Sequence, residues 1–102
     1  MNCGQIDDTD YYRLPCGRYL EDFIAWAKLD FAEGSALKYR WRAGKKDGET
    51  ADKDMAKMAH YARFLARRGC VDEADVVAEV DGWLLEATAW DGIERPYAPP
   101  RR

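Results

Sequence analysis

The chain has 102 residues, 47% of them hydrophobic and 34% charged, and a formal net charge of -3 at pH 7. This length supports one hydrophobic core and excludes a second domain. No apolar run approaches the roughly 20 residues needed to cross a bilayer, and the N-terminus is acidic where a signal peptide would be basic and then apolar. We therefore expect a cytoplasmic protein with no membrane partner.

The charges are distributed unevenly along the chain. Residues 1–37 carry 7 acids and 3 bases, residues 38–68 carry 4 acids and 10 bases, and residues 69–94 carry 8 acids and no base. Helices of opposite sign can pack side by side and pair weakly at their rims. Alternatively, one charged face steers an oppositely charged partner towards the protein. The composition leaves both interpretations open.

The first helix is expected after an irregular segment. Residues 1–17 have no helical period and contain many turn-forming residues. A helix is predicted from about Arg18, and its buried positions recur at helical spacing: Leu20, Phe23, Ile24 and Ala27. We place the helical domain at residues 18–92.

A second helix is predicted to begin at Asp30, because Glu33 three residues later completes a capping-box pattern. Its expected core positions are Ala32, Ala36, Tyr39 and Ala43, with Leu37 and Trp41 beside them. Gly44 is expected to end this helix, since the following turn, residues 44–48, is rich in residues that tolerate a left-handed backbone.

A third helix is predicted from residues typical of helix termini at both of its ends. Thr50 is its predicted N-cap, and Gly69 follows two arginines at its C-terminus. Apolar residues at helical spacing form its expected buried stripe: Met55, Met58, Ala59, Ala62, Leu65 and Ala66.

The fourth helix is predicted to begin at Asp72. It has a broad apolar face made of Val76, Val77, Val80, Trp83, Leu84, Ala87 and Trp90. Prolines exclude helix beyond it, so residues 93–102 are expected to form a flexible tail rich in proline and arginine. The predicted fold is therefore an all-α, compact bundle of about four helices in a single domain.

The basic centre supplies a candidate site for phosphate or an acidic partner. Gly34, Lys38, Arg42 and Lys45 fall at i, i+4, i+8 and i+11, so they share one side of the second helix, and the glycine leaves that side open to close approach. The candidate binding residues are Lys38, Trp41, Arg42, Lys45, Lys46, Lys57 and Tyr61. Trp41, if exposed, would serve as an interface anchor or a stacking platform. The alternative is an internal network in which Glu33 and Asp54 pair with Arg42 and Lys57.

The fourth helix supplies a second candidate surface, an acidic face for binding a partner. Its residues are Asp75, Glu79, Asp81 and Glu86.

A metal site and a nucleophilic site are not expected. The potential ligands Cys3, Cys16, His60 and Cys70 lack the short paired spacing of metal sites, so the cysteines are interpreted as reduced thiols. The single histidine, in the third helix, has no evident nucleophile partner and is interpreted as a half-buried structural residue.

The segment 31–48, FAEGSALKYRWRAGKKDG, followed by the segment 54–61, DMAKMAHY, resembles a family of small bacteriophage domains of unknown function. Some members of that family are labelled nucleotide kinases. The resemblance covers roughly residues 12–68 and implies a phage origin. The chain differs from the family at three positions. It has Ser35 where asparagine is usual, Met58 where a small residue is usual, and His60 where an aromatic residue is common.

We expect the protein to act by binding and not by catalysis, without a cofactor. The turn at residues 44–48 is not a P-loop, because it lacks the first glycine at the required spacing, the hydroxyl residue after lysine and a preceding strand. The first interpretation is a phage-encoded accessory protein that inhibits a host defence machine, as anti-CRISPR proteins do. The alternative is a nucleotide-binding or nucleotide-kinase-like protein that takes a Mg-nucleotide. A third is a subunit that dimerises through the aromatic residues of the fourth helix. The flanking acidic segments argue against direct nucleic-acid binding.

Overall fold

Four helices make up most of the described chain. The computed structural model describes residues 11–45 and 48–98, and in these it contains α2 (Leu20–Trp26), α3 (Phe31–Lys45), α4 (Gly48–Gly69) and α5 (Glu73–Ala89). The same residues contain no β-strand and one isolated bridge, between Arg13 and Tyr19. The all-α prediction with about four helices is confirmed. Within these residues no helix has the length and apolar content needed to span a membrane.

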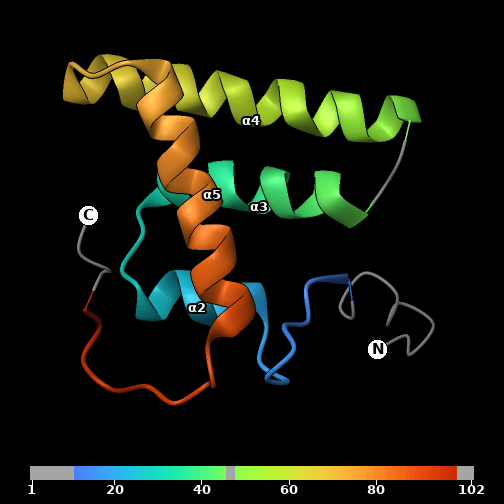
Figure 1. Cartoon of the computed structure of the whole chain (residues 1–102), viewed down its shortest axis with the longest axis vertical. Helices are drawn as coiled ribbons and strands as arrows, with labels where there is room; N and C mark the ends of the chain where they lie inside the picture. Colours follow the sequence, from blue (N-terminus) through green and yellow to red (C-terminus); the bar gives the residue numbers. More distant parts are fainter. Residues whose placement is uncertain (1–10, 46–47, 99–102) are drawn as a thin grey trace.

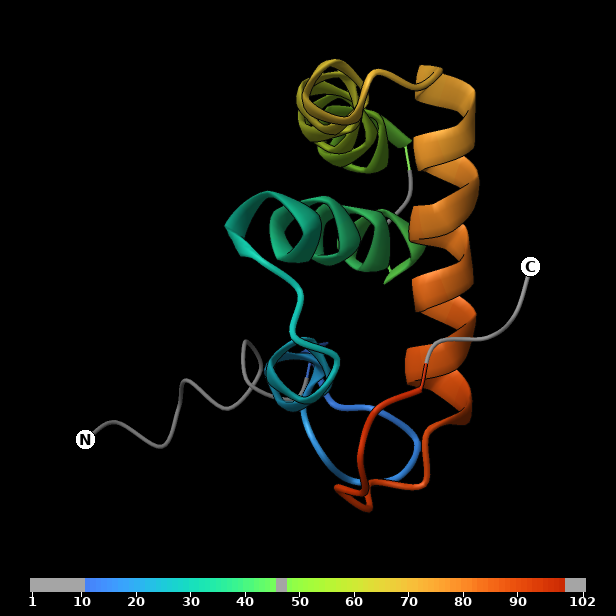
Figure 2. The ribbon, with the colours of Figure 1, turned by 90° about the vertical axis from the view of Figure 1, so that its left-hand side faces the viewer.

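The helices pack around a central pair. α3 and α4 lie side by side and run in opposite directions, and α5 crosses both of them and extends down to α2 (Figure 1). Seen from the side, α5 covers one face of the α3–α4 pair (Figure 2). This arrangement buries one side of α3 under α5 and leaves another side of α3 uncovered by it.

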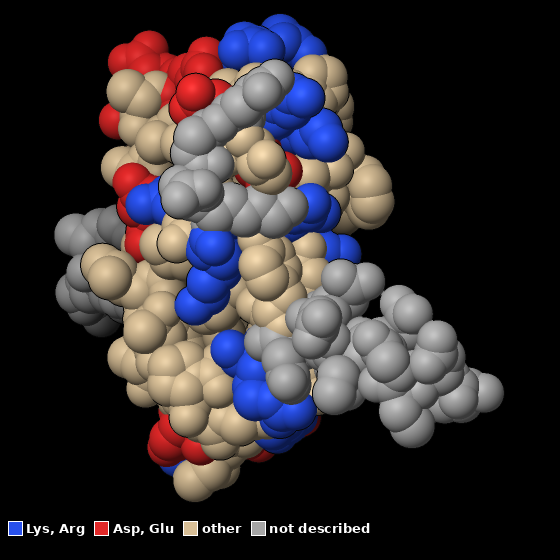
Figure 3. All heavy atoms as spheres, turned by 90° about the vertical axis from the view of Figure 1, so that its right-hand side faces the viewer, with Lys and Arg blue, Asp and Glu red and all other residues tan. Residues whose placement is uncertain are grey.

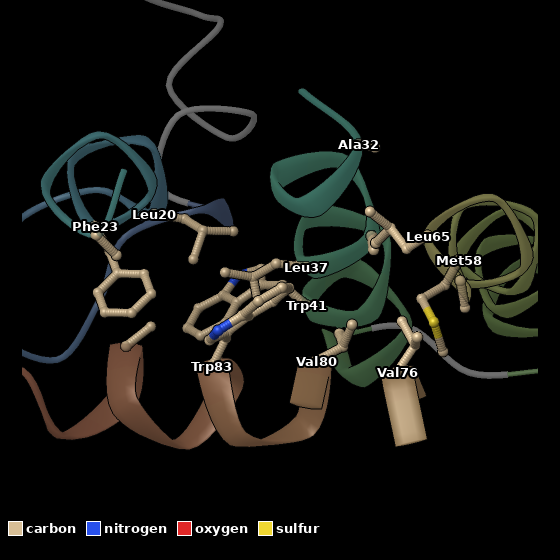
Figure 4. Close-up of a cluster of buried hydrophobic side chains, with 14 of the residues drawn as sticks. Leu20, Phe23, Ala32, Leu37, Trp41, Met58, Leu65, Val76, Val80 and Trp83 are labelled. Carbon is tan, nitrogen blue, oxygen red and sulfur yellow. The ribbon is translucent and has the colours of Figure 1, made fainter. Parts of the chain in front are cut away.

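The core lies where α5 meets the other helices, and most of it follows the predicted periodicities. Leu20, Phe23, Leu37 and Val80 are at most 2% exposed. In the close-up, α5 projects its valines and Trp83 towards α3 and α4, while α2 supplies the aromatic and leucine side chains at the opposite end (Figure 4). Apolar residues at i, i+4 and i+7 along α5 explain why this helix can contact three others at once.

The observed N-termini of three helices can be compared with the capping residues predicted from the sequence. The backbone N–H of Asp30 donates to Glu33 Oε1 and the N–H of Glu33 donates to Asp30 Oδ1, both at 2.9 Å, which confirms the predicted capping box. Asp72 is the N-cap residue of α5, as predicted. The prediction for Thr50 is wrong, because α4 begins at Gly48 and Thr50 lies inside its first turn.

Cys70, and not Gly69, takes the left-handed conformation after α4, with φ of 56°. The N–H of Val71 donates to the carbonyl oxygen of Ala66 at 3.0 Å, and the N–H of Cys70 donates to that of Arg67 at 3.3 Å. These two bonds satisfy carbonyl groups of the last turn in a Schellman arrangement. A cysteine therefore occupies a position where glycine would be less strained.

Two predicted positions on α4 are wrong. Met55, expected in the core, is 38% exposed, and His60, expected to be half-buried, is exposed. The buried stripe is narrower than predicted because α4 is covered by α3 and α5 on one side only.

Of the segment expected to form a flexible tail, residues 93–98 pack back onto the domain, and residues 99–102, with the ending Pro-Pro-Arg-Arg, lie outside the described residues. Trp26 and Trp90 stack with ring centroids 4.9 Å apart, and the Tyr97 ring meets Trp26 edge-on at the same distance. The Tyr97 hydroxyl donates to Glu86 Oε1 at 2.6 Å, and Trp26 Nε1 donates to the carbonyl oxygen of Arg95. These contacts hold residues 95–97 against α2 and α5.

Candidate functional site

A hollow of about 250 Å³ brings tyrosines and cations together beside α3 and α4. We call it the tyrosine–lysine pocket, and its lining residues are Tyr12, Phe31, Ser35, Lys38, Tyr39, Arg42 and Tyr61. Arg40, on the same helix, pairs with Asp81 of α5. Because Arg40 is roughly 200° around the helix from both Lys38 and Arg42, the pocket lies on the side of α3 that faces away from α5.

Aromatic rings form the walls of the tyrosine–lysine pocket. Tyr39 and Tyr61 lie nearly parallel, with an interplanar angle of 16° and centroids 6.1 Å apart. Phe31 meets Tyr61 edge-on at 6.1 Å and is 79% exposed. Such an exposed aromatic side chain, next to a second ring, offers a flat apolar surface to a ligand.

Two lysines lie over tyrosine rings that line the pocket. Lys38 Nζ lies 5.4 Å from the centroid of the Tyr12 ring, and Lys57 Nζ lies 5.5 Å from that of Tyr39. Both are exposed, and neither forms a salt bridge with any carboxylate of residues 11–45 or 48–98. Their positive charges are therefore not offset by neighbouring carboxylates in the described part of the chain, and an anion can approach them from solvent.

Arg42 has a different role, because it faces a buried acid. Arg42 Nε lies 3.6 Å from Asp54 Oδ2, and Asp54 is 2% exposed. Burial works against the charged guanidinium, but Tyr12 and Asp54 together outweigh it and hold the pKa of Arg42 above its usual value. The charge of Arg42 is thus largely neutralised by Asp54 within the protein. The internal network considered from the sequence contains this Arg42–Asp54 pair.

The other half of that network is absent among the described residues. Glu33 caps α3 and lies 3.9 Å from Arg68 Nη2, so it does not neutralise Arg42. Lys57 faces a ring and no acid in the same residues. Arg42 is therefore paired internally, whereas Lys38 and Lys57 have no carboxylate partner among the described residues.

The segment before α2 closes one end of the pocket. The Tyr11 hydroxyl donates to the carbonyl oxygen of Arg42 at 3.2 Å, and Trp41 Nε1 donates to the carbonyl oxygen of Tyr11 at 3.0 Å. Burial raises the pKa of Tyr12, although Arg42 acts in the opposite direction. These contacts fix the Tyr12 ring beside Lys38.

Several predicted site residues lie elsewhere. Trp41 is only 5% exposed, so it is not the exposed anchor or stacking platform considered from the sequence. Lys45 Nζ stands 4.5 Å over the Trp41 ring, outside the tyrosine–lysine pocket, and Lys46 lies outside the described residues. Gly34 is buried, with Ile24 Cγ2 3.1 Å from where its Cβ would be, so its open side receives Ile24 of the same chain.

The pocket also contains residues that sequence reasoning missed. The helical periodicity predicts Tyr39 as a core residue and indicates no site role for Phe31 or Tyr12. On α3 the signal was the recurrence of Phe31, Ser35, Lys38, Tyr39 and Arg42 along one side of the helix. No local pattern indicated Tyr12, which reaches the pocket through the path of the chain before α2.

The four acidic residues of α5 do not form one available surface. Asp81 Oδ1 accepts a hydrogen bond from Arg40 Nε at 3.0 Å, and Glu86 accepts one from Tyr97. Asp75 is exposed and Glu79 is half-buried. At least Asp81 and Glu86 are therefore engaged with structural partners.

The thiols and the histidine are dispersed. Cys16 is half-buried and Cys70 is exposed, both as free thiols, and Cys3 lies outside the described residues. Over the described ranges, no group of three or more His, Cys, Asp or Glu side chains is placed to hold a metal ion.

Comparison with known proteins adds no relative. The chain matches no family model, no curated protein and no solved structure. The resemblance to the phage domain family stays a prediction from its motifs.

Proposed function

We propose that the protein binds a nucleotide in the tyrosine–lysine pocket. The observation that carries this proposal is the placement of Lys38, and of Lys57 at the margin, over tyrosine rings that line a single hollow. A nucleotide combines the two groups that such a hollow favours, a flat aromatic base and an anionic phosphate. The motif resemblance to a phage domain family with members labelled nucleotide kinases is a second support.

The aromatic walls and the lysines would contact different parts of the nucleotide. A base stacked on an aromatic side chain contributes roughly 1–3 kcal/mol, with little preference among bases. Lys38 and Lys57 supply point charges for phosphate oxygens, while Arg42, which also lines the pocket, is held by Asp54. The volume, about 250 Å³, is slightly below the roughly 300–1,000 Å³ of most small-molecule sites, so we expect a mononucleotide that remains partly exposed.

The proposal concerns binding and not phosphate transfer. Transfer would also require a carboxylate that holds Mg²⁺ near the phosphates. Of the described residues that line the pocket, none is a carboxylate.

Calorimetric titration tests this proposal directly. We expect deoxynucleoside monophosphates to bind more tightly than the matching nucleosides or inorganic phosphate, because only the nucleotide uses both the rings and the lysines. Lys38→Gln should weaken nucleotide binding about fivefold, the upper range for an exposed ion pair. Tyr61→Leu should weaken it about tenfold through lost stacking.

Lys28→Gln is the matched control, since Lys28 is an exposed lysine beyond α2 and outside the pocket. Its affinity for nucleotide should equal that of the wild type. Binding that is unchanged in Lys38→Gln and in Tyr61→Leu, or no binding of any nucleotide at millimolar concentration, would reject the pocket as a nucleotide site.

A second candidate is a phage accessory protein that inhibits a host defence machine by binding it in the host cytoplasm. It is favoured by Phe31, which is 79% exposed, and by Phe64, which is 42% exposed with Arg68 5.6 Å from its ring centroid. Aromatic residues, phenylalanine included, and arginine are enriched in protein–protein interfaces. A host protein that co-purifies with the wild type and is lost in Phe64→Ser, with nucleotide affinity unchanged, would favour this candidate over the first.

A further inference from the structure

A second and larger hollow lies on the side of α3 that faces α5. Its volume is about 400 Å³. We call it the tryptophan–arginine cavity, and its lining residues are Arg13, Leu14, Pro15, Arg40, Trp41, Gly44, Lys45, Leu84 and Thr88. They come from the segment before α2, the C-terminal half of α3 and the C-terminal half of α5. No residue is shared with the tyrosine–lysine pocket.

Apolar side chains form much of this cavity. Leu14 is 2% exposed and Trp41 is 5% exposed, so both present only a small surface, which faces the hollow. Leu84 of α5 is half-buried opposite them. An apolar body placed here would remove this surface, and its own, from water, which favours binding.

Cations stand around the apolar part. Arg40 Nε is 3.0 Å from Asp81, and Arg13 Nη2 donates to the Tyr19 hydroxyl at 2.7 Å, so both guanidinium groups are held in place. Lys45 Nζ stands 4.5 Å over the Trp41 ring and forms no salt bridge within the described ranges. The described lining contains three cations and no acid.

The molecular surface agrees with this charge pattern. Lysine and arginine side chains gather on the face where α3 ends and α4 begins, and acidic side chains lie mainly towards its margins (Figure 3). The C-terminal carbonyl groups of α3 oppose an anion with only about half a negative charge. Arg40 is paired with Asp81, but Lys45, which forms no salt bridge within the described ranges, supplies a full positive charge that outweighs that contribution.

We infer that the tryptophan–arginine cavity binds an amphipathic organic anion, whose aliphatic or aromatic body rests on Leu14, Trp41 and Leu84 and whose carboxylate or sulfonate meets Lys45. The same chemistry is offered by a small organic acid and by the C-terminal residue of a peptide. This inference does not depend on the nucleotide proposal, because α3 separates the two sites.

The test uses the full chain and the fluorescent probe 8-anilinonaphthalene-1-sulfonate, which is an apolar body with one anionic group. We expect saturable binding to one site, weakened about fivefold by Lys45→Gln and unchanged by the matched control Lys28→Gln. Decanoate should displace the probe, whereas decyltrimethylammonium, of similar apolar size and opposite charge, should not. Nucleoside monophosphates should also leave the probe bound.

A second variant fills the cavity. A Cβ at Gly44 would meet only Arg40 Nη1, at 3.7 Å, so Gly44→Leu adds a side chain at the cavity without a close contact at its Cβ. Leucine is also a better helix former than glycine, so the variant should melt no lower than the wild type. We expect it to abolish probe binding while nucleotide binding in the other pocket continues.

Competition identifies the source of the anion. Tighter displacement by a short peptide ending in a free leucine carboxylate than by its C-terminal amide indicates a protein terminus, and tighter displacement by decanoate than by either indicates a small acid. Both outcomes support the site. Probe binding that is insensitive to both Lys45→Gln and Gly44→Leu, or the absence of probe binding to the folded protein, would overturn it.

Discussion

Arg42 is expected to stabilise the fold, and removing its charge should show this. Arg42→Met keeps most of the apolar stem and removes the guanidinium that faces Asp54 Oδ2 at 3.6 Å. Breaking a fully buried ion pair by removing one partner costs about 3–5 kcal/mol. Asp54 is 2% exposed, but the Arg42 side chain is 34% exposed, so water can partly replace the guanidinium. We therefore expect a loss of about 2 kcal/mol in the free energy of unfolding, which is a large part of the 5–15 kcal/mol typical of a domain.

Urea unfolding followed by circular dichroism at pH 7 measures this loss, and a double-mutant cycle assigns it to the pair. Asp54→Asn in the Arg42→Met background should recover about 1 kcal/mol, because the buried carboxylate is no longer charged. Lys38→Met is the control, and it should change stability by no more than about 0.5 kcal/mol, since Lys38 is exposed and faces a ring. A loss below about 0.5 kcal/mol in Arg42→Met, or strictly additive effects of the two substitutions, would refute the assigned role.

Three further changes test other parts of the structure. Cys70→Gly should raise the free energy of unfolding by about 1 kcal/mol in the same urea assay, because Cys70 has φ of 56°, and a lower stability would show that its thiol contributes more than its backbone strain costs. A side-chain hydrogen bond from Arg95 and the backbone N–H of Ile93 hold the pKa of Asp91 below its usual value, so this stabilisation is present above about pH 4 and is lost as the pH falls through the folded-state pKa. Thermal melts of Asp91→Asn should be lower than wild type at pH 7 and converge with it in acid, and a constant difference would contradict the linkage. Burial raises the pKa of Tyr12 because it disfavours the charged tyrosinate in the folded protein. The contribution of the neutral Tyr12 side chain to stability is therefore fully present below about pH 10 and is lost as the pH rises through the folded-state pKa. In the same thermal-melt assay, Tyr12→Phe should lose less stability than the wild type between pH 9 and pH 11. Equal losses would exclude Tyr12 as the titrating group.

Elements with a local cause could be predicted from the sequence. The Asp30–Glu33 capping box depends on residues three apart, and it forms as expected. The buried stripes of α3 and α5 depend on helical periodicity, and Ala36 and Val80, one from each predicted stripe, are fully buried. Such features require no knowledge of the rest of the chain.

Features that depend on contacts between distant segments could not be predicted. The prolines after Trp90 exclude helix, but they do not reveal that Tyr97 would pack against Trp26, 71 residues earlier. The same limit applies to the candidate site. Tyr12 lies in a segment without periodicity, and its position beside Lys38 follows only from the path of the chain before α2.

The distribution of cations around α3 determines which variants can report on binding. Arg40 and Arg42 lie on different sides of the helix, and each faces a carboxylate, Asp81 at 3.0 Å and Asp54 at 3.6 Å. Lys38 and Lys45 stand over aromatic rings instead, one at each hollow. Guanidinium groups suit fixed pairing with carboxylates, whereas an exposed ammonium on a flexible stem can move to meet a ligand. Arginine variants of α3 will therefore change stability together with binding, and the two lysines separate the sites without disturbing the fold.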